Sequence, residues 1–90
     1  MQQTIKTSEL SAEEICRLGE AIYDRDLKHK LEPAHIGEFV VIHVGTGDYF
    51  VDSDEFRAVD AASARYPDEV FFIGRIGFST VDRIGIYHQG

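Results

Sequence analysis

Two patterns of apolar residues divide the chain, a helical period near the N-terminus and two continuous runs farther on. Between residues 12 and 31, apolar side chains recur at intervals of three and four, which is typical of an amphipathic helix. Ser11 and Glu14 form the S-x-x-E capping box that begins such a helix. We expect it to end at Glu32-Pro33, because the residue before proline is disfavoured in the α region. Leu27 already lies at the edge of the apolar stripe. We therefore expect the last two turns either to depart from a regular helix or to pack against a different part of the molecule.

The continuous runs predict strands. Residues 39–44 are apolar but for His43, and residues 70–76 are apolar but for Arg75. Both runs are rich in β-branched or aromatic side chains and are bounded by turn residues, which favours buried strands over helices. The turn sequence 45–48 is followed by a second alternating stretch, so residues 38–52 are expected to form a β-hairpin. Residues 81–87 alternate more weakly and predict a fourth strand at an edge.

A second helix is predicted between the hairpin and the second apolar run. Residues 52–55 offer an N-cap and acidic side chains for its first turn, and Tyr66-Pro67 ends it. Phe56, Val59 and Tyr66 should form its apolar stripe, together with Ala62 or Ser63. Its many small residues would let this helix lie close on a sheet.

These elements assemble into an α+β fold. We expect a two-layer domain with a small mixed β-sheet of three to four strands in the order 2-1-3-4, a β-hairpin, a crossover helix and the long N-terminal helix. The helix between strands two and three implies a right-handed crossover that leaves these strands parallel. Residues 11–90 form this single domain, and residues 1–10 form a flexible arm. Strands buried on both faces need a second cover, supplied either by the N-terminal helix or by another subunit, and we therefore predict a homodimer.

Composition restricts the class of protein. The 90 residues carry a formal net charge of -7, which argues against nucleic acid or an anionic membrane as the principal partner. A single cysteine, Cys16, excludes an intrachain disulfide and favours a reducing cytoplasm. No apolar run has the length of an export signal or a transmembrane helix.

Positive indications of catalysis or cofactor binding are absent from the sequence. The four histidines have no metal-ligand spacing, so we expect neither a metal nor a cofactor. Among the histidines, His43 deserves the closest examination, since a buried imidazole beside Asp48 or another carboxylate would be a candidate for a perturbed pKa. The expectation is therefore that the protein is not an enzyme.

The charge is unevenly distributed. Residues 1–69 hold 15 acids and 7 bases, whereas residues 70–90 hold one acid and two bases. Glycines, apolar residues and a lone arginine recur around Arg75 and Arg83, a composition suited to a sheet edge that pairs with another chain. We take Arg75, Phe78, Arg83 and Ile84 as candidate partner-binding residues. The alternative is that both arginines pair with acids of their own domain.

The order of short motifs resembles that of a known family. The motifs are Leu31-Glu32-Pro33, Gly37-Glu38-Phe39-Val40, Gly47-Asp48-Tyr49, Tyr66-Pro67-Asp68 and Arg75-Ile76-Gly77-Phe78 with Arg83-Ile84-Gly85. The chain resembles, over residues 9–86, small uncharacterised bacterial proteins that are common in cyanobacteria. The resemblance implies a non-enzymatic companion, encoded beside a retropepsin-like protease or in gene pairs of toxin-antitoxin type. It implies no catalytic residues, and Ser79-Thr80-Val81-Asp82 departs from the family pattern.

Three functions follow as hypotheses. The first is a non-catalytic protein-interaction module, antitoxin-like or a protease companion, which binds a protein encoded nearby. The second is a small enzyme or ligand-binding domain that uses His43, Asp48, Tyr49 and Arg75. The third is a purely structural, homo-oligomeric domain.

Overall fold

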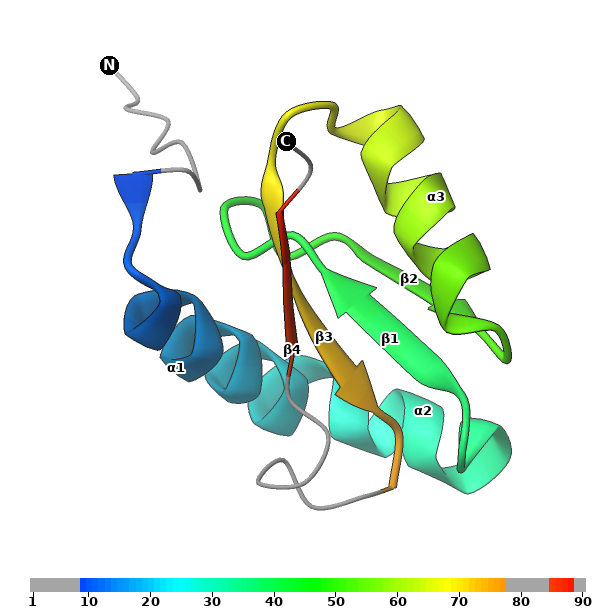
Figure 1. The fold of residues 1–90 in the computed structure, drawn as a ribbon. Helices are drawn as coiled ribbons and strands as arrows, with labels where there is room; N and C mark the ends of the chain where they lie inside the picture. The colour runs from blue at the N-terminus through cyan, green and yellow to red at the C-terminus, as the bar shows by residue number, and fades with distance from the viewer. Residues whose placement is uncertain (1–8, 78–84, 89–90) are drawn as a thin grey trace.

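The computed structural model describes residues 9–77 and 85–88, and most of the segment 1–10, predicted to be a flexible arm, lies outside this range, as do residues 78–84 and 89–90. The elements, in chain order, are α1 (Ala12–Ile22), the π-helical turn η2 (Tyr23–Leu27), α2 (Lys28–His35), β1 (Phe39–Ile42), β2 (Tyr49–Asp52), α3 (Glu55–Arg65), β3 (Val70–Arg75) and β4 (Gly85–His88) (Figure 1). The fold is α+β, as predicted.

The sheet has the order β2-β1-β3-β4. β1 pairs antiparallel with both β2 and β3, and β4 pairs antiparallel with β3. The predicted order 2-1-3 and the hairpin are therefore confirmed. The prediction of a mixed sheet is wrong, because β2 and β3 are parallel to each other but are separated by β1, so that every neighbouring pair is antiparallel.

Helices cover both faces of the sheet, which corrects the predicted two-layer arrangement. Side chains on alternate strand positions point to opposite faces. Val40, Ile42 and Phe72 pack with α1, η2 and α2, whereas Val41, Phe71 and Ile73 pack with α3. Figure 1 shows the two groups of helices on opposite sides of β1 and β3. The N-terminal helical segment therefore supplies the second cover for β1 and β3, the first of the two alternatives that the sequence left open.

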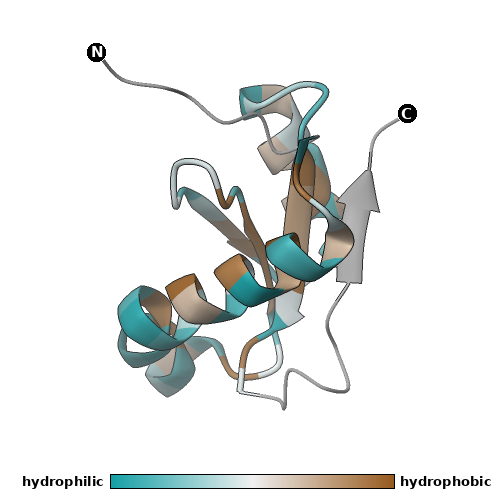
Figure 2. Cartoon of the chain, turned by 90° about the vertical axis from the view of Figure 1, so that its left-hand side faces the viewer, coloured by the Kyte–Doolittle hydropathy of each residue, from teal (hydrophilic) through white to brown (hydrophobic). Residues whose placement is uncertain are grey.

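The N-terminal helical segment begins as predicted and then departs from an ideal α-helix. Both reciprocal bonds of the capping box are present: Glu14 N–H donates to Ser11 Oγ at 3.1 Å, and Ser11 N–H donates to Glu14 Oε1 at 2.8 Å. In Figure 2, α1 alternates teal and brown along its length, as an amphipathic helix does. The bond from Ser11 N–H to the Glu14 carboxylate, together with a side-chain bond from Ser11, lowers the pKa of Glu14.

The drift of the apolar stripe has its physical cause in η2. A π turn accommodates one residue more than an α turn. The buried positions Ile15, Gly19, Tyr23, Leu27 and Leu31 are four residues apart throughout, an interval at which an ideal α-helix of 3.6 residues per turn would gradually rotate the apolar stripe around its axis. Through the wide turn, Leu27 and Leu31 return to the core, with 2% and 5% of their surface exposed.

The predicted stop at Pro33 is wrong, because α2 continues to His35 with Pro33 inside it. Proline removes one amide donor and disfavours, without forbidding, the α region for the residue before it. Two helical residues follow Pro33 before Ile36 takes an extended conformation, with ψ at 130°.

The predicted stripe of α3 is correct at Val59 and Ala62 and wrong at Phe56. Asp54 caps the helix by accepting from Phe56 N–H at 2.8 Å. The buried side chains of α3 are Ala58, Val59 and Ala62, whereas Phe56 is 76% exposed. Small residues thus form the face of α3 that lies against β1 and β3.

Candidate functional site

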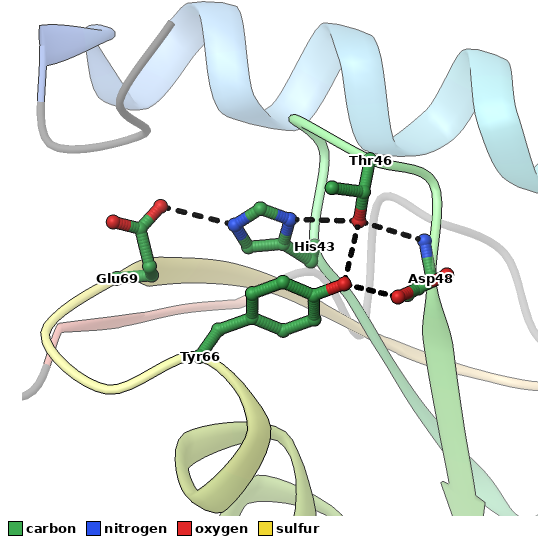
Figure 3. A network of polar contacts seen from close by, with 5 residues as sticks. All are labelled: His43, Thr46, Asp48, Tyr66 and Glu69. Atoms are coloured by element: carbon green, nitrogen blue, oxygen red, sulfur yellow. Dashed lines mark hydrogen bonds and ion pairs between the residues drawn. The ribbon is translucent and has the colours of Figure 1, made fainter. Parts of the chain in front are cut away.

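A cluster of polar side chains lies at the end of the sheet where β1 ends and β3 begins (Figure 3). His43 follows β1 directly, Thr46 and Asp48 belong to the hairpin turn, and Tyr66 and Glu69 lie in the connection from α3 to β3. Because β1 and β3 run antiparallel with Ile42 beside Phe72, the end of one strand meets the start of the other. We refer to these five residues as the His43 network.

The hairpin turn places three members of the network. Thr46 N–H and Gly47 N–H both donate to His43 O, at 3.2 and 2.7 Å, and His43 N–H donates to Asp48 O at 2.9 Å. Gly47 has a φ of +84°, a left-handed conformation that side chains rarely adopt, so glycine suits this position. The turn thereby brings the Thr46 hydroxyl next to the imidazole of His43.

The connection after α3 places the other two members. Tyr66 N–H donates to Ala62 O at 2.8 Å and closes the last helical turn. Asp68 follows with a φ of +65°, a conformation that aspartate tolerates better than most residues. This reversal of the chain sets the Tyr66 ring against one face of His43 and the Glu69 carboxylate at its Nε2 edge (Figure 3).

His43 is the centre of the network and is 5% exposed. Its Nδ1 lies 2.9 Å from Thr46 Oγ1, and its Nε2 lies 3.0 Å from Glu69 Oε1. The ring stacks on Tyr66, with centroids 4.0 Å apart and planes 5° from parallel. Both nitrogens and one face of the imidazole are thus occupied, as a buried polar ring requires.

Thr46 and Tyr66 extend the network to Asp48. Asp48 N–H donates to Thr46 Oγ1 at 3.2 Å, and Tyr66 O–H donates to Asp48 Oδ2. A neutral imidazole that donates from Nε2–H to Glu69 accepts a hydrogen bond at Nδ1 from the Thr46 hydroxyl. A doubly protonated imidazole instead donates to Thr46, whose O–H then points to Tyr66 Oη, 3.3 Å away. The network therefore accommodates either state of the imidazole without losing a partner for it.

The order hydroxyl, imidazole and carboxylate is the order that activates a nucleophile in hydrolases. In this chain the hydroxyl belongs to a turn residue and already contacts His43, Tyr66 and the Asp48 amide. These contacts are the ones that hold a hairpin end against the connection from α3 to β3. These contacts make the network a structural clamp that joins the two loops.

The four residues of the alternative ligand-binding hypothesis are only partly brought together. His43 and Asp48 share the network, but Tyr49 points to the sheet face opposite Asp48, since neighbouring strand residues alternate. Arg75 lies at the other end of β3, where its Nε donates to Gly37 O at 3.0 Å and its guanidinium lies 5.5 Å from the centroid of Phe39. Arg75 is therefore engaged within its own domain. Of the other candidate partner-binding residues, Phe78, Arg83 and Ile84 lie outside the described residues.

Thr46, Tyr66 and Glu69 were missed by the sequence reasoning. Glu69 is 26 positions from His43, so no local motif joins them. The pairing of the two most apolar runs could have indicated the contact, because antiparallel neighbours bring the residue after one strand close to the residue before the next.

A second polar contact ties η2 to the C-terminal end of β3. Tyr23 is 7% exposed, donates to Glu32 Oε2 at 3.0 Å, and accepts from Gly77 N–H at 3.4 Å. Burial, and to a smaller extent the neighbouring Glu32 carboxylate, raise the pKa of Tyr23 to about 12.

The outer edge of β2 is free in the part of the chain that the structure describes. Because His43 and Asp48 form a hydrogen-bonded pair, the pairs at Phe50 and Asp52 also exchange backbone bonds with β1. The backbone N–H and C=O groups of Tyr49 and Val51 then point away from the sheet. This edge presents four backbone groups to a neighbouring strand.

Other kinds of site find no support among residues 9–77 and 85–88. Within that range, no three His, Cys, Asp or Glu side chains are grouped so that they could hold a metal ion. No described helix has the length and apolar character needed to cross a bilayer.

The chain was compared with family models, curated proteins and solved structures, and none of them matches it.

Proposed function

We propose that this protein is a non-catalytic interaction module that accepts an extended segment of another protein at the free edge of β2. The observation that carries the proposal is the outward direction of the Tyr49 and Val51 backbone groups, which no strand pairs in the described part of the chain. Exposed edges of this kind bind partners by strand addition, in which the main chain supplies the hydrogen bonds.

Exposed aromatic side chains at the two ends of β2 support the proposal. Tyr49 begins the strand and is 38% exposed, and Phe56 follows it in the first turn of α3 and is 76% exposed. Aromatic residues are enriched in protein interfaces, where they bury large areas with few rotatable bonds.

The His43 network supports the proposal by fixing the edge before a partner arrives. It fastens the hairpin turn, which begins β2, to the connection between α3 and β3. A strand held in place loses little conformational entropy on binding. The companion role implied by the family resemblance agrees with this function, so the product of an adjacent gene is the first partner to test. We place the module in the cytoplasm, in keeping with its lone Cys16.

A pair of substitutions at Tyr49 tests the proposal. Tyr49→Pro removes the outward N–H, and proline is tolerated on edge strands when its nitrogen faces away from the sheet. Tyr49→Thr removes the ring but keeps the N–H. Each variant is co-expressed with the products of the neighbouring genes, and any complex is rebuilt from purified proteins and measured by calorimetry.

We expect Tyr49→Thr to weaken the complex moderately and Tyr49→Pro to abolish it. Phe50→Pro is the folding control, because its N–H bonds to β1 and its loss should destabilise the hairpin itself. Equal binding by the wild type and Tyr49→Pro would show that a partner uses another surface. If purified neighbours form no complex with the wild type, the companion role is contradicted.

A further inference from the structure

On the basis of the proposed strand addition, we infer the chemistry of the segment that β2 accepts. We propose a five-residue segment of a different protein, with Lys or Arg at its first and fifth positions and apolar residues between them. The inference starts from the charge around the edge, since residues 39–56 contain four acids and neither Lys nor Arg.

The alternation of β2 sets the positions of the two cations. Asp48, Phe50 and Asp52 share one face of the strand, as the contacts of Asp48 with Tyr66 and of Phe50 with the α3 side of the core show. Asp48 and Asp52 are four residues apart, one at each end of the strand. An added strand has residues directly opposite both, and opposite charges in such pairs are favourable. Cations at positions one and five therefore fit.

Both carboxylates keep capacity for a cation. Asp48 uses Oδ2 to accept from Tyr66, and Asp52 uses Oδ1 to accept from Asp54 N–H at 2.8 Å. A carboxylate has two oxygens with about four acceptor positions in all. An ammonium or guanidinium group can therefore add to either side chain without displacing these bonds.

The three central positions face apolar residues. The middle residue of the segment lies opposite Phe50, and the second and fourth lie opposite Tyr49 and Val51 on the other face. Aromatic and β-branched side chains pair well with such neighbours. Because the pattern reads the same in both directions, it holds for a parallel or an antiparallel partner strand.

A second copy of this chain does not fit the edge. No two Lys or Arg residues stand four positions apart anywhere in the 90 residues. Two β2 edges placed side by side would set Asp48 or Asp52 opposite an aspartate of the other copy, and like charges directly opposite are unfavourable. The occupant is therefore a segment of another protein.

Peptide titrations followed by NMR of the isotope-labelled full chain test this inference. The probes are three capped peptides with the cores Lys-Val-Ile-Val-Lys, Lys-Lys-Val-Ile-Val and Glu-Val-Ile-Val-Glu. We expect the first to shift the Tyr49 and Val51 amide signals and to bind at least tenfold more tightly than the third. The second, which has the same composition but the wrong spacing, should bind several-fold more weakly than the first.

Two isosteric substitutions, each of which removes one negative charge, locate the effect. Asp52→Asn should weaken binding of the first peptide about two- to fivefold, the range expected for one exposed ion pair. Asp60→Asn, on the exposed side of α3, changes the net charge equally and should leave the affinity unchanged. Equal binding of all three peptides at the β2 amides, or equal effects of the two substitutions, would overturn the inference and leave strand addition standing. If no peptide shifts those amides at millimolar concentration, strand addition at β2 itself is contradicted.

Discussion

The two faces of the sheet are covered by helices that pack in different ways. On the face of α1, η2 and α2, large side chains interlock, and a Cβ at residue 19 would overlap the ring of Phe72. On the face of α3, Ala58 and Ala62 let the helix backbone approach the strands. The first face is stabilised by large side chains that fit closely together. The second combines a close approach of the α3 backbone to the strands with the hydrogen bonds of the His43 network.

This difference shows where each face should be sensitive. Interlocked large residues lose most when a ring is removed, because neighbours cannot collapse into the space. A close helix loses most when a small residue is enlarged. Four predictions follow from these two kinds of packing and from the polar contacts beside them.

The largest effect is expected at Phe72. Phe72→Ala should lower the free energy of unfolding by about 3–5 kcal/mol, as for other buried aromatic residues. Gly19→Ala alone should cost about 1–3 kcal/mol, because its methyl group meets the ring, although alanine favours helices. In the Phe72→Ala background the same methyl group occupies vacated space, so Gly19→Ala should become neutral or stabilising. Urea unfolding of the four proteins measures this coupling, and additive effects would contradict the contact.

The next effect is expected at His43. His43→Ala removes both side-chain hydrogen bonds of the imidazole and its stack on Tyr66, and should cost about 2–3 kcal/mol. Tyr66→Phe keeps the stack and loses only the hydroxyl contacts, so its cost should stay below about 1 kcal/mol. His29→Ala, at an exposed position of α2, is the matched control and should change stability by less than about 0.5 kcal/mol. Similar losses from His43→Ala and His29→Ala would show that the network does not act as a clamp.

A smaller effect is expected from enlarging the face of α3. Ala62 is fully buried against the sheet, so Ala62→Leu should push the helix outward and cost about 1–3 kcal/mol. Ala61→Leu adds the same atoms at an exposed position and should stay within about 0.5 kcal/mol of the wild type. Thermal unfolding of both variants gives the comparison, and equal midpoints would mean that α3 does not lie close on the strands.

The smallest effect is expected from the ionisation of Tyr23 at high pH. Its pKa is raised to about 12 in the folded protein, against about 10 in an unfolded chain. Between these values the unfolded state releases the proton first, so stability should fall as the pH rises, by about 1–2 kcal/mol relative to Tyr23→Phe. Unfolding by urea at intervals from pH 9 to pH 12, in the range that the two pKa values set, measures the difference. Parallel curves for the two proteins would show that Tyr23 is not held neutral by the fold.

Local signals in the sequence predicted the local structure well. The capping box at Ser11, the cap at Asp54 and the turn around Gly47 each depend on a few neighbouring residues, and each has the predicted role. The two apolar runs predicted central strands because their period leaves no polar face. Short-range chemistry of this kind is independent of the rest of the fold.

Contacts between distant residues were predicted less well. Burial of both faces of β1 required a second cover, but the sequence left open whether a helix or another subunit supplies it. Phe56 fits the helical stripe of α3, yet the face that packs is the one whose residues are small enough to approach the sheet. The partners of His43 depend on the register between β1 and β3: the sequence predicted that these strands are neighbours, but not which of their residues lie opposite one another.

The wide turn η2 has a consequence for how the chain can vary in length. If one residue between Tyr23 and Leu27 were deleted, the wide turn would close to an ordinary α turn, and Leu27 would follow Ile22 after four residues and Tyr23 after three, both of which are helical intervals. The same side chains would then still face the strands. A deletion at this point therefore leaves the packing of both flanking helices in phase, whereas the same change within α1 or α2 would rotate the residues beyond it away from the core.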